Sequence, residues 1–443
     1  MKVVHCLGWY LPDSSGGTEN YVRALAREQR AQGLDVCVMA PRDGDEGACY
    51  EHEGVPVVRY PVPEARSRAQ QEGLASHGRF DAFCVALQEE APDVFHLHSL
   101  TYGAGPAHLR QARRLGARTV VTAHVPGFVC TRGTMMRMGR EACDGRVDVE
   151  QCVPCWLQSK GLSQPLLTPA GALLRRVPFG VAGFLPGRAG TVLGSADRVR
   201  GQRATMRELA ELADRTVAVC AWLRDALRDN GVPGSRLLLV RQAVDALLPA
   251  SDRGPHLPEG DAGVPTLRIG YFGRAHPVKG LGLLVRAVHA ASRQHAIALR
   301  IHALTGSEEE RAHLREVRRL IGSDERIRVM APVPPEQVVS TMRGCDLVAV
   351  PSRWLETGPM VAMDALAAGV PVLGSDLGGL RELGEPGVTG WLEPVDDLER
   401  WRARIETLAV PGAAKLSWSP EHPGLQTWPE LAARMLDLYR ELT

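Results

Sequence analysis

Short apolar runs alternate with amphipathic stretches along the first half of the chain. Residues 18–32 place Val22, Leu25 and Ala26 on one helical face, and this stretch ends near Gly33. An apolar run on each side completes a βαβ unit, the opening of a doubly wound parallel sheet. The strands expected in this half are residues 2–8, 36–40, 57–60, 94–98, 119–123, 216–220 and 237–241.

A second series of the same kind starts at residue 267, after a stretch rich in Pro, Gly and Asp that reads as a linker. Its expected strands are residues 267–272, 298–302, 327–330, 347–350 and 370–373, with helices at 281–292 and 429–442. The predicted fold class is α/β, with two Rossmann-like domains facing across a cleft. The predicted parts are an N-terminal acceptor domain (1–250), a linker (251–266), a nucleotide-sugar domain (267–425) and a C-terminal helix (426–443) that could pack back on the first domain.

Composition and charge narrow the class of protein. The 443 residues are 44% hydrophobic, enough for a large core, and the net charge of +1 gives no general attraction to nucleic acid or membranes. No run of 18 uncharged apolar residues predicts a transmembrane helix. The first residues lack the long apolar core of a signal peptide, so a cytoplasmic protein is expected.

A loop carboxylate precedes the most informative helix of the second half. Glu356 lies beside Gly358 and Pro359, and the apolar run 360–368 follows as a helix with Asp364 about one turn inside. The first turn of a helix offers backbone N–H groups and a positive dipole end, which bind anions. A carboxylate beside such a site suits sugar hydroxyls next to a phosphate.

Two cations follow the first strand of the second half. Arg274 closes that strand and Lys279 lies five residues later, where doubly wound sheets bind their ligands. Fixed positive charge of this kind can hold a diphosphate without a metal; a pair of solvated loop charges is the alternative. In the first half, the Gly16-Gly17 pair would let backbone approach a diphosphate, or is an ordinary tight turn.

Three segments together resemble one known family. GGTENYV, GRAHPVKG and ETGPMVAMDALAAGVPVLGSDLGGLREL occur in the order found in family 4 glycosyltransferases, which have the GT-B fold. The resemblance covers most of the chain and is strongest over residues 269–394. It implies a retaining transferase that moves a sugar from a nucleotide-diphosphate sugar to a hydroxyl of a small-molecule, glycan or lipid-linked acceptor, without a catalytic metal.

The resemblance also implies roles for single residues of the second half. Arg274 and Lys279 would hold the diphosphate, and Glu356 would contact the hydroxyls of the donor sugar. Asp364 stands where the family usually has a glutamate on the ribose hydroxyls, so its shorter reach would alter donor affinity or nucleotide choice. Backbone contacts to sugar and phosphate are implied for Gly358, Pro359 and Met360, and for Gly16 and Gly17 from the other wall.

Histidines mark the strand ends of the first half. His124 follows the strand 119–123, and in the family the matching histidine contacts the donor sugar and lines the reaction centre. Glu356 and His124 are therefore the expected catalytic residues, with a packed histidine as the alternative for the latter. His96 and His98 alternate along one strand and face the same side, which favours core histidines over a cleft lining.

Four cysteines in an insertion over about residues 130–160 form a possible metal site. Their spacing is Cys130-x12-Cys143-x8-Cys152-x2-Cys155, and the final pair has metal-ligand spacing. Structural zinc is the first hypothesis; an iron–sulfur cluster, cysteine pairs or free thiols are the alternatives. A metal there would fold a loop over the acceptor pocket. Five other cysteines are expected in the core (Cys6, Cys37, Cys84, Cys220 and Cys345), and Cys49 falls in a polar loop.

Residues 161–208 carry seven arginines against two carboxylates, a local charge of +5, with apolar pieces between them. Such a segment could touch an anionic membrane or a phosphorylated acceptor, or form a solvated face. Two other functions fit the same motifs: a sugar-phosphate synthase or epimerase-like enzyme, and a non-catalytic, metal-stabilised module that binds sugar nucleotides. The sugar, the base, the acceptor and the oligomeric state are not determined by the sequence.

Overall fold

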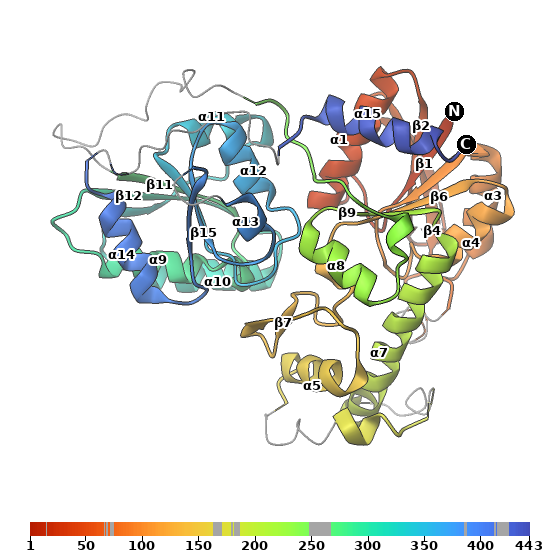
Figure 1. Ribbon diagram of the computed structural model, residues 1–443, viewed down its shortest axis with the longest axis horizontal. Coiled ribbons are helices and arrows are strands. Elements are labelled where there is room, and N and C mark those ends of the chain that lie inside the picture. The colour runs from red at the N-terminus through yellow and green to blue at the C-terminus, as the bar shows by residue number, and fades with distance from the viewer. Residues whose placement is uncertain are drawn as a thin grey trace. The chain divides into compact units, whose positions relative to one another are not determined.

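The structure, a computed structural model, forms two units (Figure 1). The N-terminal unit comprises Met1–Gln242 and Trp428–Thr443, and the C-terminal unit comprises Ala243–Thr427. The predicted linker, residues 251–266, lies outside the described residues. Described are residues 1–14, 16–65, 75–162, 171–178, 187–247, 267–384, 388–411 and 425–443, with the single positions 67, 70, 180 and 413.

The strands of the N-terminal unit form one large sheet and a small hairpin. They are β1 (Lys2–Cys6), β2 (Asp35–Asp43), β3 (Ala48–His52), β4 (Val55–Val62), β5 (Val94–Leu97), β6 (Arg118–Ala123), β9 (Arg215–Ala218) and β10 (Leu237–Leu239), with the hairpin β7 (Met136–Arg137) and β8 (Glu141–Ala142). The described strands of the large sheet lie in the order β10-β9-β6-β5-β1-β2-β4-β3. Its pairs are parallel, for example β1 with β5 and β2, except for the antiparallel pair β3–β4. The predicted doubly wound sheet is confirmed.

Strand β3 corrects one expectation. Cys49 lies on this edge strand and is exposed, although the polar sequence around it suggested a loop. The strand alternates between exposed and half-buried side chains, and an edge strand with one partner needs no apolar run. Of the five cysteines expected in the core, four are buried and Cys84 is partly exposed.

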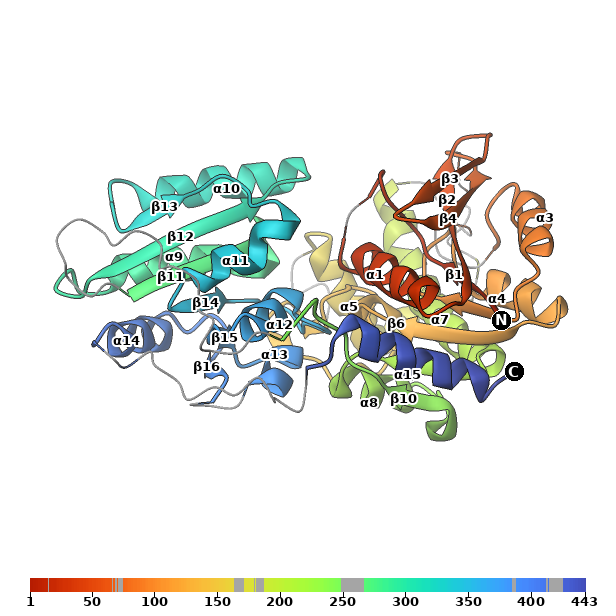
Figure 2. The same ribbon diagram turned by 90° about the horizontal axis from the view of Figure 1, so that it is seen from above.

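The helices of the N-terminal unit pack around this sheet, with one exception. They are α1 (Gly17–Ala31), α3 (Phe80–Glu90), α4 (Pro106–Arg114), α5 (Val149–Ser159), α7 (Gly187–Leu212), α8 (Ala221–Asp229) and α15 (Trp428–Arg440), with 3-10 turns η1 (Pro126–Phe128) and η3 (Gly234–Arg236). The exception is α5, which packs against α7 (Figure 1). The C-terminal helix α15 runs beside α1 in both ribbon views (Figures 1 and 2). The tip of α15 reaches the sheet: the Tyr439 hydroxyl lies 2.7 Å from His96 Nδ1. No helix in the described ranges is long and apolar enough to cross a bilayer.

The C-terminal unit has a six-stranded parallel sheet. Its strands are β11 (Leu267–Arg274), β12 (Ile297–Leu304), β13 (Ile327–Val329), β14 (Leu347–Val350), β15 (Val372–Ser375) and β16 (Gly390–Glu393). They lie in the order β13-β12-β11-β14-β15-β16, so the chain builds outward from β11 in one direction and then from β14 in the other. The reversal between β11 and β14 is the topological switch point, where doubly wound sheets bind ligands.

Helices on both faces complete this unit. They are α9 (Leu281–Ala290), α10 (Glu308–Ile321), α11 (Val338–Arg343), α12 (Met360–Ala367), α13 (Gly378–Leu383) and α14 (Leu398–Leu408), with 3-10 turns η5 (Pro277–Lys279) and η6 (Pro335–Gln337). One difference from the predicted boundaries has a clear cause. The N–H of Val370 bonds to the Ala365 carbonyl at 2.8 Å and closes the end of α12, so β15 starts two residues later than predicted.

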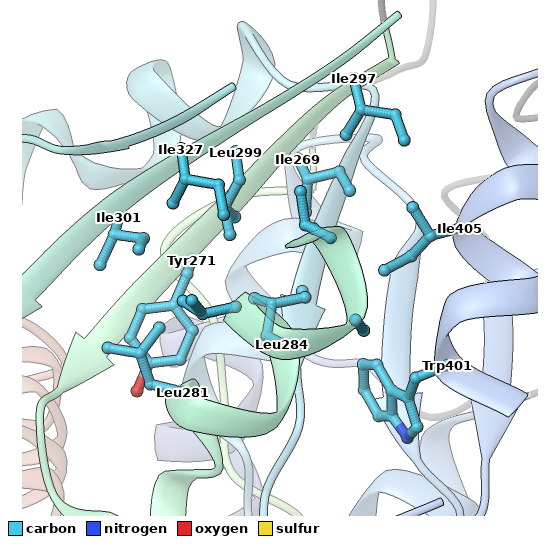
Figure 3. Packing of buried hydrophobic residues seen from close by; sticks show 14 of the residues in the cluster. Ile269, Tyr271, Leu281, Leu284, Ile297, Leu299, Ile301, Ile327, Trp401 and Ile405 are labelled. Carbon is cyan, nitrogen blue, oxygen red and sulfur yellow. The ribbon is translucent and has the colours of Figure 1, made fainter. Parts of the chain in front are cut away.

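One face of the sheet in the C-terminal unit carries the larger apolar cluster (Figure 3). Ile269 and Ile301 point from neighbouring strands toward Leu284 of α9, and Trp401 of α14 lies against the same helix. Each of these four side chains is fully buried. Burial of side chains of this size stabilises by about 1.5–3 kcal/mol each, so β11 is held firmly beneath the loops that follow it.

Candidate active site

A partly buried ion pair lies at the switch point of the C-terminal unit, with Glu356 buried and Lys279 partly exposed. Lys279 ends η5 after β11, and Glu356 lies in the loop after β14; Lys279 Nζ is 2.7 Å from Glu356 Oε1. Ser352 Oγ donates to the same carboxylate oxygen at 2.6 Å. The ammonium also lies 5.0 Å from the centre of the Trp354 ring. The loops after two neighbouring strands thus place a cation and an anion where this fold binds ligands.

Glu356 stays ionised despite its burial. Only 6% of the residue is exposed, and burial alone would raise the pKa of its carboxyl group. The charge of Lys279 and the hydrogen bonds from Lys279 and Ser352 outweigh burial and hold the pKa of Glu356 below its usual value. The carboxylate therefore accepts hydrogen bonds and has no proton to donate near neutral pH.

Glycines set the spacing of these loops. Gly280 follows Lys279 with φ +71°, and a Cβ built there would lie 1.8 Å from the Pro351 carbonyl oxygen. The N–H of Gly379 donates to the Glu356 carbonyl at 2.7 Å, and a Cβ on Gly379 would lie 2.7 Å from that same oxygen. Both loops that meet at the ion pair pass too close to their neighbours for any side chain.

Arg274 has a different partner from Lys279. Its guanidinium bonds to Glu310 in the first turn of α10, a carboxylate that also accepts from the N–H groups of Gly306 and Ser307. The Arg274 side chain is 61% exposed while that of Glu310 is fully buried. Arg274 is therefore anchored at one end and open to a ligand at the other.

Met360 and Asp364, two further residues expected to contact the donor, lie on α12. The N–H of Met360 donates to the Gly358 carbonyl at 2.8 Å, so that donor already has a protein acceptor. Asp364 is partly buried, and burial with the nearby charge of Asp245 raises its pKa to about 7. Its ionised form, which accepts hydrogen bonds on both oxygens, therefore grows from pH 6 to pH 8.

The paired glycines of the N-terminal unit start a helix. Gly16 caps α1 and Gly17 is its first residue, at the end of the loop that follows β1. A Cβ on Gly16 would lie 2.7 Å from Glu19 Oε2, whereas one on Gly17 would meet nothing within 4 Å. Neither glycine is crowded by a neighbouring backbone, because the atoms nearest to a Cβ on Gly16 belong to the end of the Glu19 side chain.

His124 joins a set of buried histidines in the N-terminal unit. His98 Nδ1 lies 3.0 Å from His124 Nε2, and His5 Nδ1 lies 2.9 Å from His98 Nε2. His96 is buried beside them, with its ring centroid 3.9 Å from that of His98. Burial lowers the pKa of His124 to about 3, and burial with the neighbouring rings lowers the pKa of His98 well below its usual range. His96 and His98 are core histidines, as the alternation predicted.

The four insertion cysteines gather around one cavity. Cys130, Cys143, Cys152 and Cys155 line it together with Arg132, Arg137 and Arg146. They form no disulfide. Across the described chain, however, only His5, His96 and His98 bring three possible ligand atoms within 4.8 Å of one another, so the four sulfurs are spaced more widely than in a closed metal site.

The basic segment is only partly described, since residues 163–170, 179 and 181–186 lie outside the described ranges. Arg175 pairs with Glu150 at 2.8 Å, and Arg200 pairs with Asp197 at 3.3 Å. Much of the remainder is the long helix α7, which the sequence did not predict. These two pairs favour a structural use of the arginines, and the predicted membrane contact stays a prediction.

Partners of the assigned residues were missed at three places. Ser352 and Asp245 gave no distinctive signal, since one is a loop serine and the other lies far from Asp364 in sequence. Gln29 did give one: it falls on the apolar face of α1, four residues after Leu25 and three after Ala26, and is fully buried. A buried amide needs a hydrogen-bond partner, and its partner is His5.

Two family models match the chain. The model described as "Glycosyl transferase 4-like domain" matches residues 16–243, just over half of the chain. The model described as "Glycosyl transferases group 1" matches residues 266–410. Together they cover both units and both sets of site residues.

Eight curated relatives of the chain carry the same name. The D-inositol 3-phosphate glycosyltransferase of Corynebacterium efficiens is 31% identical over 232 residues, which is 50% of this chain and 54% of that one. That of Nocardia farcinica is 32% identical over 212 residues, 42% of this chain and 47% of that one. The chain spans about half the length of the curated relatives it matches.

Solved structures match over the full length. A sucrose-phosphate synthase from Thermosynechococcus elongatus has a TM-score of 0.66 at 18% identity and covers 100% of this chain and 99% of its own. The Anabaena protein HepE, in complex with UDP and glucose, has a TM-score of 0.62 at 15% identity over 100% of both chains. At these identities the likeness shows the fold, and the predicted GT-B fold is confirmed.

Proposed function

Because the chain belongs to family 4 of the glycosyltransferases, we propose that it transfers a sugar, with retention, from a nucleotide-diphosphate sugar to an acceptor hydroxyl. The observation that carries this proposal is the Lys279–Glu356 pair at the switch point of the C-terminal unit, with Arg274 open to solvent at the end of the same strand. The chain thus offers two cations for a diphosphate and one ionised acceptor for sugar hydroxyls.

In the proposed chemistry the protein acts mainly by stabilising the charge of the leaving diphosphate. As the bond from sugar to phosphate breaks, negative charge grows on the diphosphate and positive charge on the sugar ring. Arg274 and Lys279 stabilise the negative charge on the diphosphate. Glu356 holds the sugar through its hydroxyls, because its low pKa keeps the carboxylate ionised. Asp364 would accept from the ribose hydroxyls, increasingly so as the pH rises through about 7.

His124 and the glycine turn of the N-terminal unit complete the proposed set. A ring whose pKa is lowered to about 3 stays neutral, which favours hydrogen bonding to the donor sugar over proton abstraction from the acceptor. Gly16 and Gly17 bring backbone to the diphosphate at the start of α1. We assign binding of the acceptor to the N-terminal unit.

The names of the relatives favour a small phosphorylated polyol as the acceptor. The direct test is to incubate the protein with a panel of UDP-, ADP- and GDP-sugars and inositol phosphates, and to identify products by mass spectrometry. Retention predicts that the anomeric configuration of the donor is found in the product by NMR. Absence of both transfer and donor hydrolysis across the panel contradicts the proposal.

Arg274→Ala is expected to weaken binding of the nucleoside diphosphate by about 1.5–3 kcal/mol, the usual cost of losing hydrogen bonds to a charged group. The fold should survive, since Glu310 keeps its two backbone donors. Calorimetric titration with UDP, ADP and GDP measures the effect. Arg286→Ala on α9 is the matched control, an exposed arginine of the same unit that should bind as wild type. Equal affinities of the two variants for the nucleoside diphosphates would show that Arg274 does not bind the diphosphate.

We also propose that the four insertion cysteines hold one structural Zn²⁺. The spacing and the shared cavity support it, as does the backbone: the N–H of Met138 donates to Cys155 Sγ at 3.2 Å, and the Gly145 backbone bonds to Cys143. Thiolates bound to metal need such donors. Cys152 and Cys155 lie one turn apart on α5, so binding an ion would draw the other two sulfurs toward that helix.

Metal analysis of the purified protein is expected to give about one zinc per chain, bound by four thiolates. Cys152→Ser with Cys155→Ser should abolish it and lower the melting temperature. Cys49→Ser changes an exposed cysteine of the same unit and should keep the zinc. Iron with visible absorption would instead indicate a cluster, and wild-type protein without any metal would refute the site.

A further inference from the structure

Four buried side chains form one hydrogen-bonded string through the N-terminal unit. Gln29 Oε1 lies 2.7 Å from His5 Nε2, His5 Nδ1 lies 2.9 Å from His98 Nε2, and His98 Nδ1 lies 3.0 Å from His124 Nε2. None of the four is more than 3% exposed. The string joins α1 to β1 and then to the residues that follow β5 and β6.

The three rings are neutral. Burial lowers the pKa of His5 to about 4 and that of His124 to about 3, and the pKa of His98 is lower than usual for the same reason and because of the rings around it. A neutral imidazole has one N–H and one lone pair. In such a string every hydrogen bond therefore runs in the same direction.

The carbonyl oxygen of Gln29 sets that direction. As an acceptor, it requires the proton of His5 on Nε2, which leaves the lone pair of His5 on Nδ1 to accept from His98 Nε2. His98 Nδ1 then accepts from His124 Nε2. Each ring is consequently the Nε2–H tautomer, and the lone pair of His124 lies on Nδ1.

Packing keeps the string in place. The Tyr21 ring lies edge-on to His124 at 4.5 Å and also contacts His98 at 5.9 Å between centroids. A second string, Thr122–His96–Tyr439, runs beside it with distances of 2.7 Å, and Tyr439 also interacts with the Gln29 side chain. The hydrogen bonds named here join uncharged side chains only.

We propose that Gln29 is a positioning residue that, through His5 and His98, fixes His124 as a hydrogen-bond acceptor at Nδ1. This role rests on the proposed function in one respect: the hydroxyl that Nδ1 accepts from would belong to the donor sugar. With the opposite tautomer, Nδ1 would carry a proton and could accept nothing. Gln29, which is joined to His124 only through His5 and His98, would thus determine that His124 accepts at Nδ1 and does not donate there.

The test is the tautomeric state of each histidine, read from long-range ¹H–¹⁵N spectra of histidine-labelled protein at pH 7 without ligand. His5, His98 and His124 are expected as Nε2–H tautomers, each assigned from the spectrum of a variant lacking that ring. Finding His124 as the Nδ1–H tautomer or as imidazolium in the wild type overturns the proposal. This outcome is read from the wild-type protein and does not depend on whether a Gln29 variant folds.

Gln29→Met removes the acceptor at nearly constant volume. We expect a mixture of tautomers at His124 and about a tenfold loss of kcat, the usual effect of one hydrogen bond. Thr122→Val removes only the hydroxyl that bonds His96, at the end of the second string far from Gln29, and should leave the His124 tautomer unchanged and kcat within about twofold. An unaltered His124 tautomer in Gln29→Met refutes the role of Gln29. If no donor is turned over by wild type while the tautomers are as expected, the proposed function fails and the string stands.

Discussion

Lys279→Met is expected to destabilise the C-terminal unit by about 3–5 kcal/mol at pH 7, the cost of leaving one member of a buried ion pair alone. Glu356 would keep its hydrogen bond from Ser352 but lose its counter-charge, at a place where only 6% of the residue is exposed. Methionine preserves the length and apolar stem of the lysine but removes its charge, and with it the cation–π contact of the ammonium with the Trp354 ring. The loss therefore reports the charge rather than the packing.

The pH dependence of this loss has a definite sign. In the wild type the pKa of Glu356 is lowered, so its stabilising effect is present above the unfolded pKa and fades as the pH falls through the folded one. Without Lys279, burial dominates and the pKa rises, so folding takes up a proton and stability falls as the pH increases. Variant and wild type should therefore differ fully at pH 7 and become similar only below the lowered pKa of wild-type Glu356, where the carboxyl group is protonated in both proteins.

The loss of stability is measured by urea unfolding, monitored through hydrogen exchange of α9 and β14. Both elements belong to the C-terminal unit, and its unfolding must be observed by itself because two units can unfold separately. The double variant Lys279→Met/Glu356→Gln removes both charges and should recover most of the stability, because neutral pairs avoid the burial penalty. A pH-independent loss, or no recovery in the double variant, would mean that the ion pair is not the source of the effect.

Gly280→Ala is expected to reduce activity by about 100-fold, which is the effect of displacing a catalytic group by about 1 Å. The new Cβ would lie 1.8 Å from the Pro351 carbonyl oxygen, and real contacts of this kind need at least 3.0 Å. The backbone must move by more than about 1 Å. Lys279, the residue directly before Gly280, would move with it. The left-handed φ of +71° adds a strain of about 1–3 kcal/mol.

Gly282→Ala provides the matched control two residues along. Its Cβ would meet only the flexible end of Arg286 at 3.7 Å, and it lies in α9, where alanine stabilises by about 0.5–1 kcal/mol. Activity and melting temperature should be at or above those of the wild type. Donor turnover and thermal unfolding of both variants separate the two outcomes, and equal activity in Gly280→Ala would show that the approach to Pro351 does not position Lys279.

Most of the fold was predictable because parallel strands buried on both faces read as short apolar runs. Residues 347–350 were predicted as a strand and form β14 with the same bounds. The errors lie where this signal is absent. Edge strand β3 has one partner and mixed polarity, and helix α7 has a poorly segregated apolar face within a basic sequence. The strand predicted to start at residue 370 starts at residue 372, because Val370 completes the end of α12.

The candidate site divides in the same way. Sequence by itself determined which residues carry charge near the strand ends: Arg274, Lys279 and Glu356 belong to short local motifs, and the strand–loop–helix order places each at the ligand-binding edge. Tertiary structure alone decided their partners. Lys279 and Glu356 pair across 77 residues, because the sheet order sets β14 beside β11. His5 meets His98 across 93 residues for the same reason, since β1 lies beside β5. Pairing across a sheet depends on strand order, and no local pattern of residues encodes that order.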